Sequence, residues 1–144
     1  YFTVYGPWGR PDMSAYLFAA AIMDGKPIQV FNHGDMQRDF TYVDDIVEGT
    51  LRVLDKPARY AVYNIGNHTP VPLLDYIATL ERALGRKAQL EMQPMQPGDV
   101  KATYADTNAL AKAVGFAPST PLEVGLARFA EWFKSWRADP RSRA

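Results

Sequence analysis

The sequence has no cysteine and only two histidines among its 144 residues. The lack of cysteine excludes disulfide bonds and thiolate metal sites, and two histidines are too few for a zinc site. Neither sign of charge is in excess, because 16 basic residues balance 16 acidic ones. A protein that binds nucleic acid usually carries a positive excess that neutralises phosphates. We therefore expect no metal ion and no nucleic-acid partner.

Long apolar runs are absent as well. No run approaches the roughly 20 apolar residues that a membrane-spanning helix needs. No basic segment followed by an apolar one forms a secretory leader. The sequence therefore predicts a soluble, cytoplasmic protein without a membrane partner. What remains is an ordinary globular composition with 47% apolar residues, in a length that suits one modest domain.

The opening residues, 1–5, read Tyr-Phe-Thr-Val-Tyr and favour a strand. A strand this apolar usually lies between neighbours inside a sheet, and not at a solvated terminus. The run also has no initial methionine and no polar segment before it. We therefore expect that the chain was cut from a longer protein.

Strands alternate with helices along the chain, which predicts the α/β class. Apolar residues recur at helical spacing in four segments, and two of these end at Gly25 and Gly85, as helices commonly do. The expected helices are Ser14–Asp24, Val43–Leu54, Pro72–Leu84 and residues 121–136. The expected strands are residues 1–5, Ile28–Phe31, Asp39–Tyr42, Ala61–Ile65 and Leu90–Gln93.

The last of these helices carries the clearest signals. Thr120 and Glu123 form a capping box around Pro121, which would occupy the first helical position. Five apolar residues then recur at four-three spacing and predict a buried stripe: Leu122, Leu126, Phe129, Phe133 and Trp136. A polar tail, residues 138–144, follows and is expected to fray. The sequence therefore predicts one structural unit over residues 1–137.

Three loops concentrate residues that suit a ligand. The first, residues 3–13, follows the opening strand and carries Thr3, Trp8 and Arg10. In open α/β sheets, ligands bind outside the carboxyl ends of strands. A hydroxyl, an indole and a guanidinium suit an anionic ligand with a planar face. The alternative is a structural turn in which Trp8 caps the core.

The second loop, residues 37–45, places Arg38 before a strand that leads into a helix start. Anions bind well at helix starts, and a guanidinium can grip a diphosphate through two hydrogen bonds. The alternative is a surface ion pair of Arg38 with Asp39 or Asp44.

The third loop, residues 96–99, ends in Asp99 and contains a Pro-Gly turn. A carboxylate held by such a turn can accept two hydrogen bonds from a ribose diol. Most turns of this kind bind nothing, so the third loop is the weakest of the three signals.

Groups for catalysis are missing from the sequence. None of the ten glycines forms the G-x-G-x-x-G or G-x-x-G-x-x-G turn that binds a dinucleotide. No tyrosine is followed by a lysine four residues later. Neither His33 nor His68 lies beside a serine nucleophile and a carboxylate. We therefore predict no catalytic residue in this chain.

Five motifs occur in an order and spacing that a known family shares. They are the Phe-Thr-Val-Tyr-Gly-Pro-Trp-Gly-Arg-Pro-Asp-Met run at 2–13 and the segments 36–46, 63–66, 96–100 and 102–106. Together they resemble the C-terminal part of extended short-chain dehydrogenase/reductase epimerases, particularly UDP-glucuronate 4-epimerases. The resemblance extends to about residue 136, and its first motif is specific to the uronate-epimerising branch. Gln96 departs from the pattern, because many galactose-type epimerases carry arginine there.

The resemblance implies a fold and a set of ligand contacts. The fold would be the substrate-binding portion of an extended Rossmann-type epimerase, whose cofactor-domain parallel sheet would include the strands near 1–5 and 61–65. Phe2 would lie against the nicotinamide of NAD. The implied substrate contacts are Thr3 with the hexose or its carboxylate, Arg10 with the sugar acid or the diphosphate, Val30 and Phe31 with uracil, Arg38 with the diphosphate and Asp99 with the ribose.

The implied reaction is C4 epimerisation of a UDP-hexuronate through a transient 4-keto sugar, with bound NAD. The family's Gly-rich cofactor turn and Tyr-x-x-x-Lys pair are absent here, so the chain alone is expected to hold the UDP-sugar and to be inactive. The alternatives are a nucleotide-sugar dehydratase, a decarboxylase or a UDP-N-acetylhexosamine epimerase on the same scaffold, or a non-catalytic binding module. Family members are commonly homodimers, and the uncovered strands are expected to make this chain self-associate.

Overall fold

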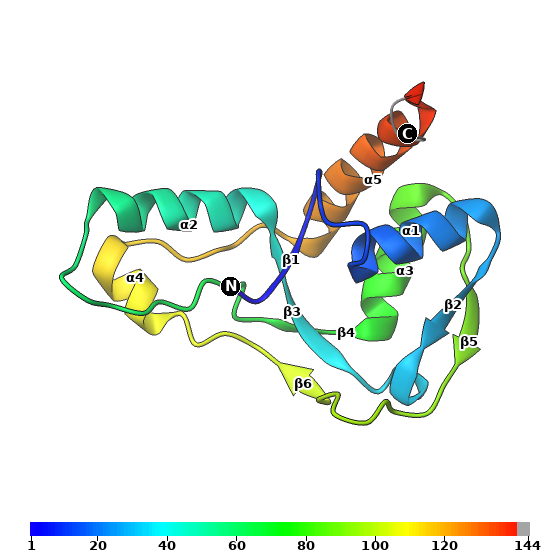
Figure 1. The fold of residues 1–144 in the computed structure, drawn as a ribbon, viewed down its shortest axis with the longest axis horizontal. Coiled ribbons are helices and arrows are strands. Elements are labelled where there is room, and N and C mark those ends of the chain that lie inside the picture. Colours follow the sequence, from blue (N-terminus) through cyan, green and yellow to red (C-terminus); the bar gives the residue numbers. More distant parts are fainter. Residues whose placement is uncertain (141–144) are drawn as a thin grey trace.

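The computed structural model describes residues 1–140 and has the α/β architecture that the sequence predicts. Helices α1, α3 and α5 gather at one end of the molecule and α2 and α4 at the other, with the central strands between them (Figure 1). The helices are α1 (Ser14–Asp24), α2 (Val43–Asp55), α3 (Leu73–Leu84), α4 (Asn108–Val114) and α5 (Leu122–Ala138).

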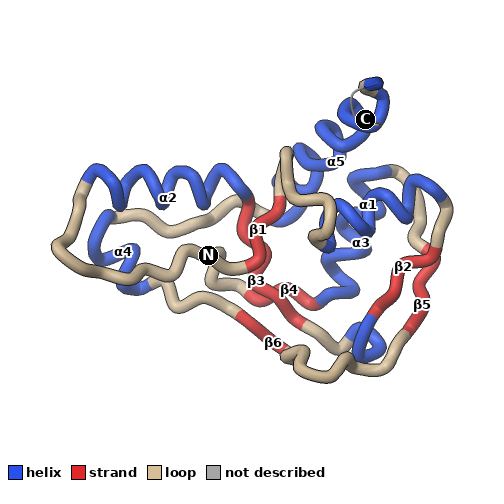
Figure 2. The backbone as a smooth tube through the Cα atoms, viewed as in Figure 1, coloured by secondary structure: helices blue, strands red, loops and turns tan. Residues whose placement is uncertain are grey.

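The strands form two separate groups, as Figure 2 shows. In the larger group, the central strand β3 (Gln37–Tyr42) pairs in parallel with β1 (Thr3–Tyr5) and β6 (Ala102–Thr103) and antiparallel with β4 (Pro70–Pro72). In the smaller group, β2 (Pro27–Val30) pairs in parallel with β5 (Gln89–Met92). A short 3₁₀ turn, η1 (Phe31–Gly34), joins β2 to the segment before β3.

The main hydrophobic core lies between β1, β3 and the helices α1, α3 and α5. At its centre the rings of Phe40 and Tyr76 stack, with centroids 3.9 Å apart. The predicted stripe of α5 is confirmed for Leu126, Phe129 and Phe133, which are fully buried there, while Leu122 and Trp136 at its two ends are half-buried. Burial of large side chains from one helix face stabilises such an arrangement, so α5 is firmly attached to the sheet.

Helix α2 is only half covered, whereas the helical spacing of its apolar residues, from Val43 to Leu54, predicts a buried stripe. Ile46 is buried in a smaller core with α4, as the sequence predicts. Val47, Leu51 and Leu54, in contrast, are 50%, 51% and 67% exposed. The prediction was wrong for these three because helical spacing shows that a face is apolar and does not show what covers it.

The strand predicted at Ala61–Ile65 is also wrong, since these residues carry no strand pairing. The segment accepts one backbone hydrogen bond from the residue before β1: the N–H of Phe2 donates to the carbonyl of Ile65 at 3.3 Å. Val62 is 76% exposed. A strand needs a ladder of such bonds with a neighbour, and one bond does not form a ladder.

The start of α5 differs from the predicted capping box. Its cap position is Pro121, and no side chain caps it. The backbone N–H of Thr120 instead donates to a carboxylate oxygen of Asp45, at 2.8 Å. Asp45 therefore links the first turn of α2 to the entrance of α5. The helix runs through Ala138, the first residue of the predicted polar tail, and residues 141–144 of that tail lie outside the described range.

The carboxylate of Asp39 ties two other segments of the chain to β3, the central strand of the larger sheet. It is fully buried, and it accepts hydrogen bonds from the backbone N–H groups of Asn67 at 2.8 Å, His68 at 3.0 Å and Ala105 at 2.9 Å. The hydroxyl of Thr41 donates a fourth bond at 3.3 Å. A buried carboxylate is tolerated only when hydrogen bonds replace its lost water. This cluster, the Asp39 hub, fixes the chain around residues 67 and 105 against β3.

Close packing around the hub explains the glycine at position 66 and yields a prediction. A Cβ at Gly66 would lie 2.5 Å from the Cβ of Ala105 and 2.8 Å from a carboxylate oxygen of Asp39. Gly66→Ala should therefore lower the free energy of unfolding by about 1–3 kcal/mol, the usual cost of overpacking. Urea denaturation measures this.

Ala105→Gly provides the matched control for Gly66→Ala. Alone, it shows the cost of an added glycine. Combined with Gly66→Ala, it removes one of the two clashing atoms and should restore part of the lost stability. A Gly66→Ala protein as stable as the unaltered one would contradict the packing described here.

Candidate functional site

A cleft of about 190 Å³ opens at the side of β3 where three predicted ligand-binding loops meet. We call it the Arg38 cleft. Its walls come from β1, α1, η1, β3, α3 and the loop before β6, which are far apart in the sequence. The lining residues are Thr3, Ser14, Phe18, Phe31, Met36, Arg38, Phe40, Leu73 and Asp99.

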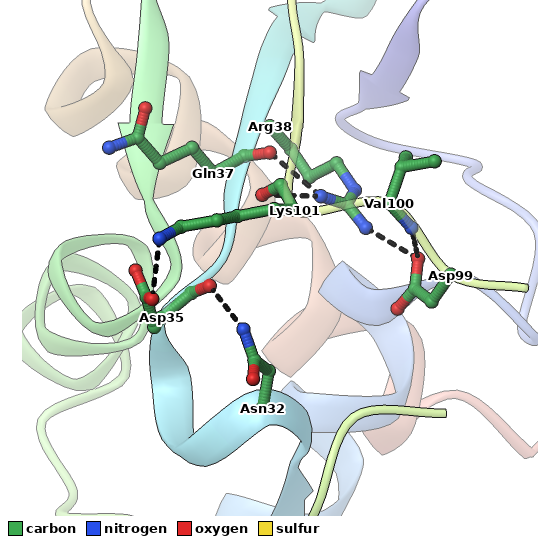
Figure 3. Close-up of polar contacts among 7 residues, drawn as sticks. All are labelled: Asn32, Asp35, Gln37, Arg38, Asp99, Val100 and Lys101. Carbon is green, nitrogen blue, oxygen red and sulfur yellow. Dashed lines mark hydrogen bonds and ion pairs between the residues drawn. The ribbon is translucent and has the colours of Figure 1, made fainter. Parts of the chain in front are cut away.

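The guanidinium of Arg38 is held in place from two sides (Figure 3). Its Nη2 donates to Oδ1 of Asp99 at 2.7 Å, and its Nη1 donates to the backbone carbonyls of Gln37 at 2.8 Å and Lys101 at 3.3 Å. The side chains of Arg38 and Asp99 are 21% and 30% exposed. The cleft therefore contains a partly desolvated cation that is already oriented and still reachable by a ligand.

The alternative partners of Arg38 are engaged elsewhere. Asp39 lies in its buried hub, and Asp44 is 3.7 Å from Arg128 of α5. The interpretation of Arg38 as a surface ion pair with either of these residues was therefore wrong. Its partner is Asp99, which lies in the loop with the weakest ligand-binding signal in the sequence.

The loop that carries Asp99 and the segment that follows η1 are connected near Arg38 (Figure 3). Lys101 Nζ lies 2.7 Å from a carboxylate oxygen of Asp35, and Asn32 donates to the backbone carbonyl of the same residue at 2.8 Å. The N–H of Val100 donates to Oδ1 of Asp99 at 2.8 Å. These contacts hold both walls in one arrangement around Arg38.

A second, larger cleft of about 470 Å³ lies beyond β1. We call it the Arg10 cleft. Arg10 itself is exposed there and pairs with Asp12, whose Oδ1 accepts from Arg10 Nε at 3.0 Å. This hydrogen bond keeps the pKa of the Asp12 carboxyl below its usual value. The lining residues are Tyr1, Phe2, Val4, Tyr5, Gly6, Pro7, Trp8, Gly9, Arg10, Met13 and Val43.

The predicted ligand residues thus fall into three places. Four of them converge on the Arg38 cleft: Thr3, Phe31, Arg38 and Asp99. Phe2 and Arg10 line the neighbouring Arg10 cleft. Val30 lines neither of these two clefts, because its side chain is fully buried among the residues of β2 and α3. Val30 is the last residue of β2, whereas Phe31 begins the η1 turn, so the chain changes direction between them.

Sequence reasoning missed the apolar wall of the Arg38 cleft. Phe18 of α1 and Leu73 of α3 line it beside Phe31. Both residues belong to amphipathic helices. The spacing of apolar residues in such a helix predicts that a side chain is buried, but it does not predict which residues that side chain contacts. Lys101, which joins the two walls, also had no signal, because it stands alone between two motifs.

Among residues 1–140, no group of three or more histidine, aspartate or glutamate side chains could hold a metal ion. Within the same residues, no helix has both the length and the apolar character needed to cross a membrane.

Comparison with known proteins agrees with the motifs and the fold. Residues 1–66 match the family described as NAD dependent epimerase/dehydratase. The resemblance predicted from the five motifs is confirmed, and so is the Rossmann-type epimerase fold.

Relatives and solved structures extend the similarity over nearly the whole chain. A protein of Methanocaldococcus jannaschii without an assigned function is 47% identical over 94% of this chain and 43% of its own length. A probable UDP-glucuronate 4-epimerase of Rhizobium meliloti is 43% identical over 92% of this chain and 45% of its own. The structure of UDP-glucuronic acid 4-epimerase from Bacillus cereus, in complex with UDP-glucuronic acid and NAD, superposes with a TM-score of 0.86 at 34% identity, over 94% of this chain and 44% of that one. The chain thus spans less than half the length of these proteins.

Proposed function

We propose that this chain is the UDP-sugar-holding part of an NAD-dependent epimerase that acts on a UDP-hexuronate at C4. One observation carries the proposal. Thr3, Arg38 and Asp99 come from three separate segments and line a single cleft. Side chains of these types, brought together from distant segments, suit the hydroxyls and phosphates of a nucleotide sugar.

The Arg38 cleft would hold the nucleotide end. Arg38 would bind the diphosphate, with the carbonyls of Gln37 and Lys101 fixing the orientation of its guanidinium. The diphosphate would replace Asp99 as the anionic partner of Arg38, and the Asp99 carboxylate would then accept hydrogen bonds from the ribose. The uracil ring would pack on Phe31 at the apolar end of the cleft.

The Arg10 cleft would hold the sugar end and the nicotinamide. Thr3, on the strand between the two clefts, would hydrogen-bond the hexose. Arg10 would exchange Asp12 for the carboxylate of the hexuronate, and this exchange costs little because exposed ion pairs contribute little stability. Phe2 would lie against the nicotinamide ring.

This division suits the chemistry of a 4-epimerase. Hydride leaves C4, the 4-keto sugar turns over, and hydride returns to its other face, so the nucleotide must be held firmly and the hexose loosely. NAD, when bound, would accept and return that hydride. The sequence contains neither a Gly-rich dinucleotide turn nor a Tyr-x-x-x-Lys pair, so these groups would belong to the rest of the parent protein and this chain alone would be inactive.

An uncovered apolar surface supports the idea of a missing cofactor-binding part. Tyr1 is 73% exposed and Leu54 67% exposed, and both line a shallow hollow with Tyr63 and Ile65. Apolar surface of this kind usually meets a partner. The cofactor-binding part would cover it in the parent, which would be a homodimer through that part, and without it this chain would self-associate.

The proposed function is tested by an activity assay on the full-length protein. Supplied with UDP-glucuronate, it should produce an isomer of unchanged mass with the opposite configuration at C4, as measured by mass spectrometry and NMR. The 144-residue chain alone should produce none. Loss of water would indicate a dehydratase, loss of carbon dioxide a decarboxylase, and no conversion at all would contradict the proposal.

The assignment of Arg38 is tested by substitution in the full-length protein. A charge-assisted hydrogen bond is worth roughly 1.5–3 kcal/mol, so Arg38→Ala should weaken UDP binding about ten- to hundred-fold in calorimetry. Arg128→Ala is the matched control, because Arg128 is an exposed arginine of α5 that lies beside Asp44, outside the cleft. An affinity for UDP within about twofold of the unaltered protein would refute the role of Arg38.

A further inference from the structure

All three tryptophans of the chain meet at one place on the surface. The ring of Trp8 lies 5.6 Å from that of Trp132 and 5.4 Å from that of Trp136, and the latter two stack at 6.3 Å with an interplanar angle of 11°. We call this group the tryptophan cluster. Trp132 and Trp136 lie one turn apart on α5, and Trp8 lies in the loop after β1, which rises beside that helix (Figure 1).

The backbone at Trp8 is in a conformation that needs support. Its φ is 62°, in the left-handed region that bulky residues rarely adopt. The loop closes through a hydrogen bond from the N–H of Gly9 to the carbonyl of Gly6 at 3.3 Å. Since Trp8 is 73% exposed, burial in the core does not hold it. Its ring contacts with α5 support this backbone conformation from outside the loop.

Helix α5 is a rigid support for this loop. Phe129 and Phe133 of the same helix are fully buried in the main core. The indole N–H of Trp132 is buried and donates to no protein group in the described chain. Ring packing, and not hydrogen bonding, therefore sets the position of Trp132.

The loop that rests on α5 is also a wall of the Arg10 cleft. Pro7, Trp8, Gly9 and Arg10 line that cleft together with Phe2. Arg10 lies two residues after Trp8, so a shift of the indole would move its guanidinium. None of the three tryptophans lines the Arg38 cleft.

We propose that Trp132 and Trp136 are positioning residues that hold loop 6–11 in the shape that receives the sugar end of the nucleotide sugar. The inference rests on the proposed function and adds a part to it. The tryptophan cluster contributes to the affinity for the hexuronate and not to the affinity for the nucleotide. A change in the cluster should therefore alter the affinity for the sugar half of the ligand without altering the affinity for the nucleotide half.

Calorimetry on the full-length protein with UDP and with UDP-glucuronate tests this separation. Trp132→Ala and Trp136→Ala should each weaken UDP-glucuronate binding roughly three- to tenfold, the size expected for lost aromatic contacts. Their affinity for UDP should stay within twofold. Trp136→Phe, which keeps an aromatic ring, should retain most of the affinity for UDP-glucuronate.

Two further variants separate positioning from stability. Leu110 of α4 is buried in the smaller core that contains Ile46, so Leu110→Ala should leave a cavity there and lower the melting temperature. The ratio of the affinities for UDP-glucuronate and UDP should stay unchanged. Trp8→Gly suits the left-handed backbone and removes the ring, so it should fold and still lose affinity for UDP-glucuronate alone.

The outcomes distinguish this inference from the proposed function. If the unaltered full-length protein binds neither ligand, the proposed function is wrong and the inference with it. If the unaltered protein binds both, and the tryptophan variants weaken both equally or neither, the inference alone is wrong.

Discussion

The buried carboxylate of Asp39 is the interaction on which the rest of this structure depends. It accepts hydrogen bonds from the backbone N–H groups of Asn67, His68 and Ala105. These residues lie in segments with little helix or strand of their own. Backbone donors satisfy the carboxylate, and the carboxylate in turn fixes the donors. Without it, β3 would lose these hydrogen bonds to the chain that leads into β4 and to the chain that leaves β6.

The same strand both secures the fold and presents the site. Adjacent residues of a strand point to opposite sides, so Asp39 faces the hub while Arg38 faces the cleft. The hub holds Ala105 near the end of β6, and β6 pairs with β3 at Arg38. The loop that carries Asp99 enters β6, so the ion pair in the cleft depends on the position of the hub.

Periodic patterns in the sequence predicted most of the fold, and the residue types of three loops predicted part of the site. The helices with long apolar stripes were found because packing repeats over several turns, as in α1, α3 and α5. Helix α4 and strands β4 and β6 were missed because each is too short for a period to be detected. The convergence of the three loops followed from the family resemblance. The pairing of Arg38 with Asp99 and the contact of Trp8 with α5 did not, because tertiary structure alone brings these residues together.

Amide hydrogen exchange on an Asp39→Asn full-length protein tests the central claim most directly, when UDP affinity is measured on the same sample. Asparagine keeps the shape of aspartate, but an NH2 group, which is a donor, replaces one of the two oxygens that accept hydrogen bonds from the backbone. The protection of Asn67, His68 and Ala105 should fall together by at least about tenfold, and UDP binding should weaken with it. Retained protection of the three amides, or its loss with unchanged UDP affinity, would contradict the account.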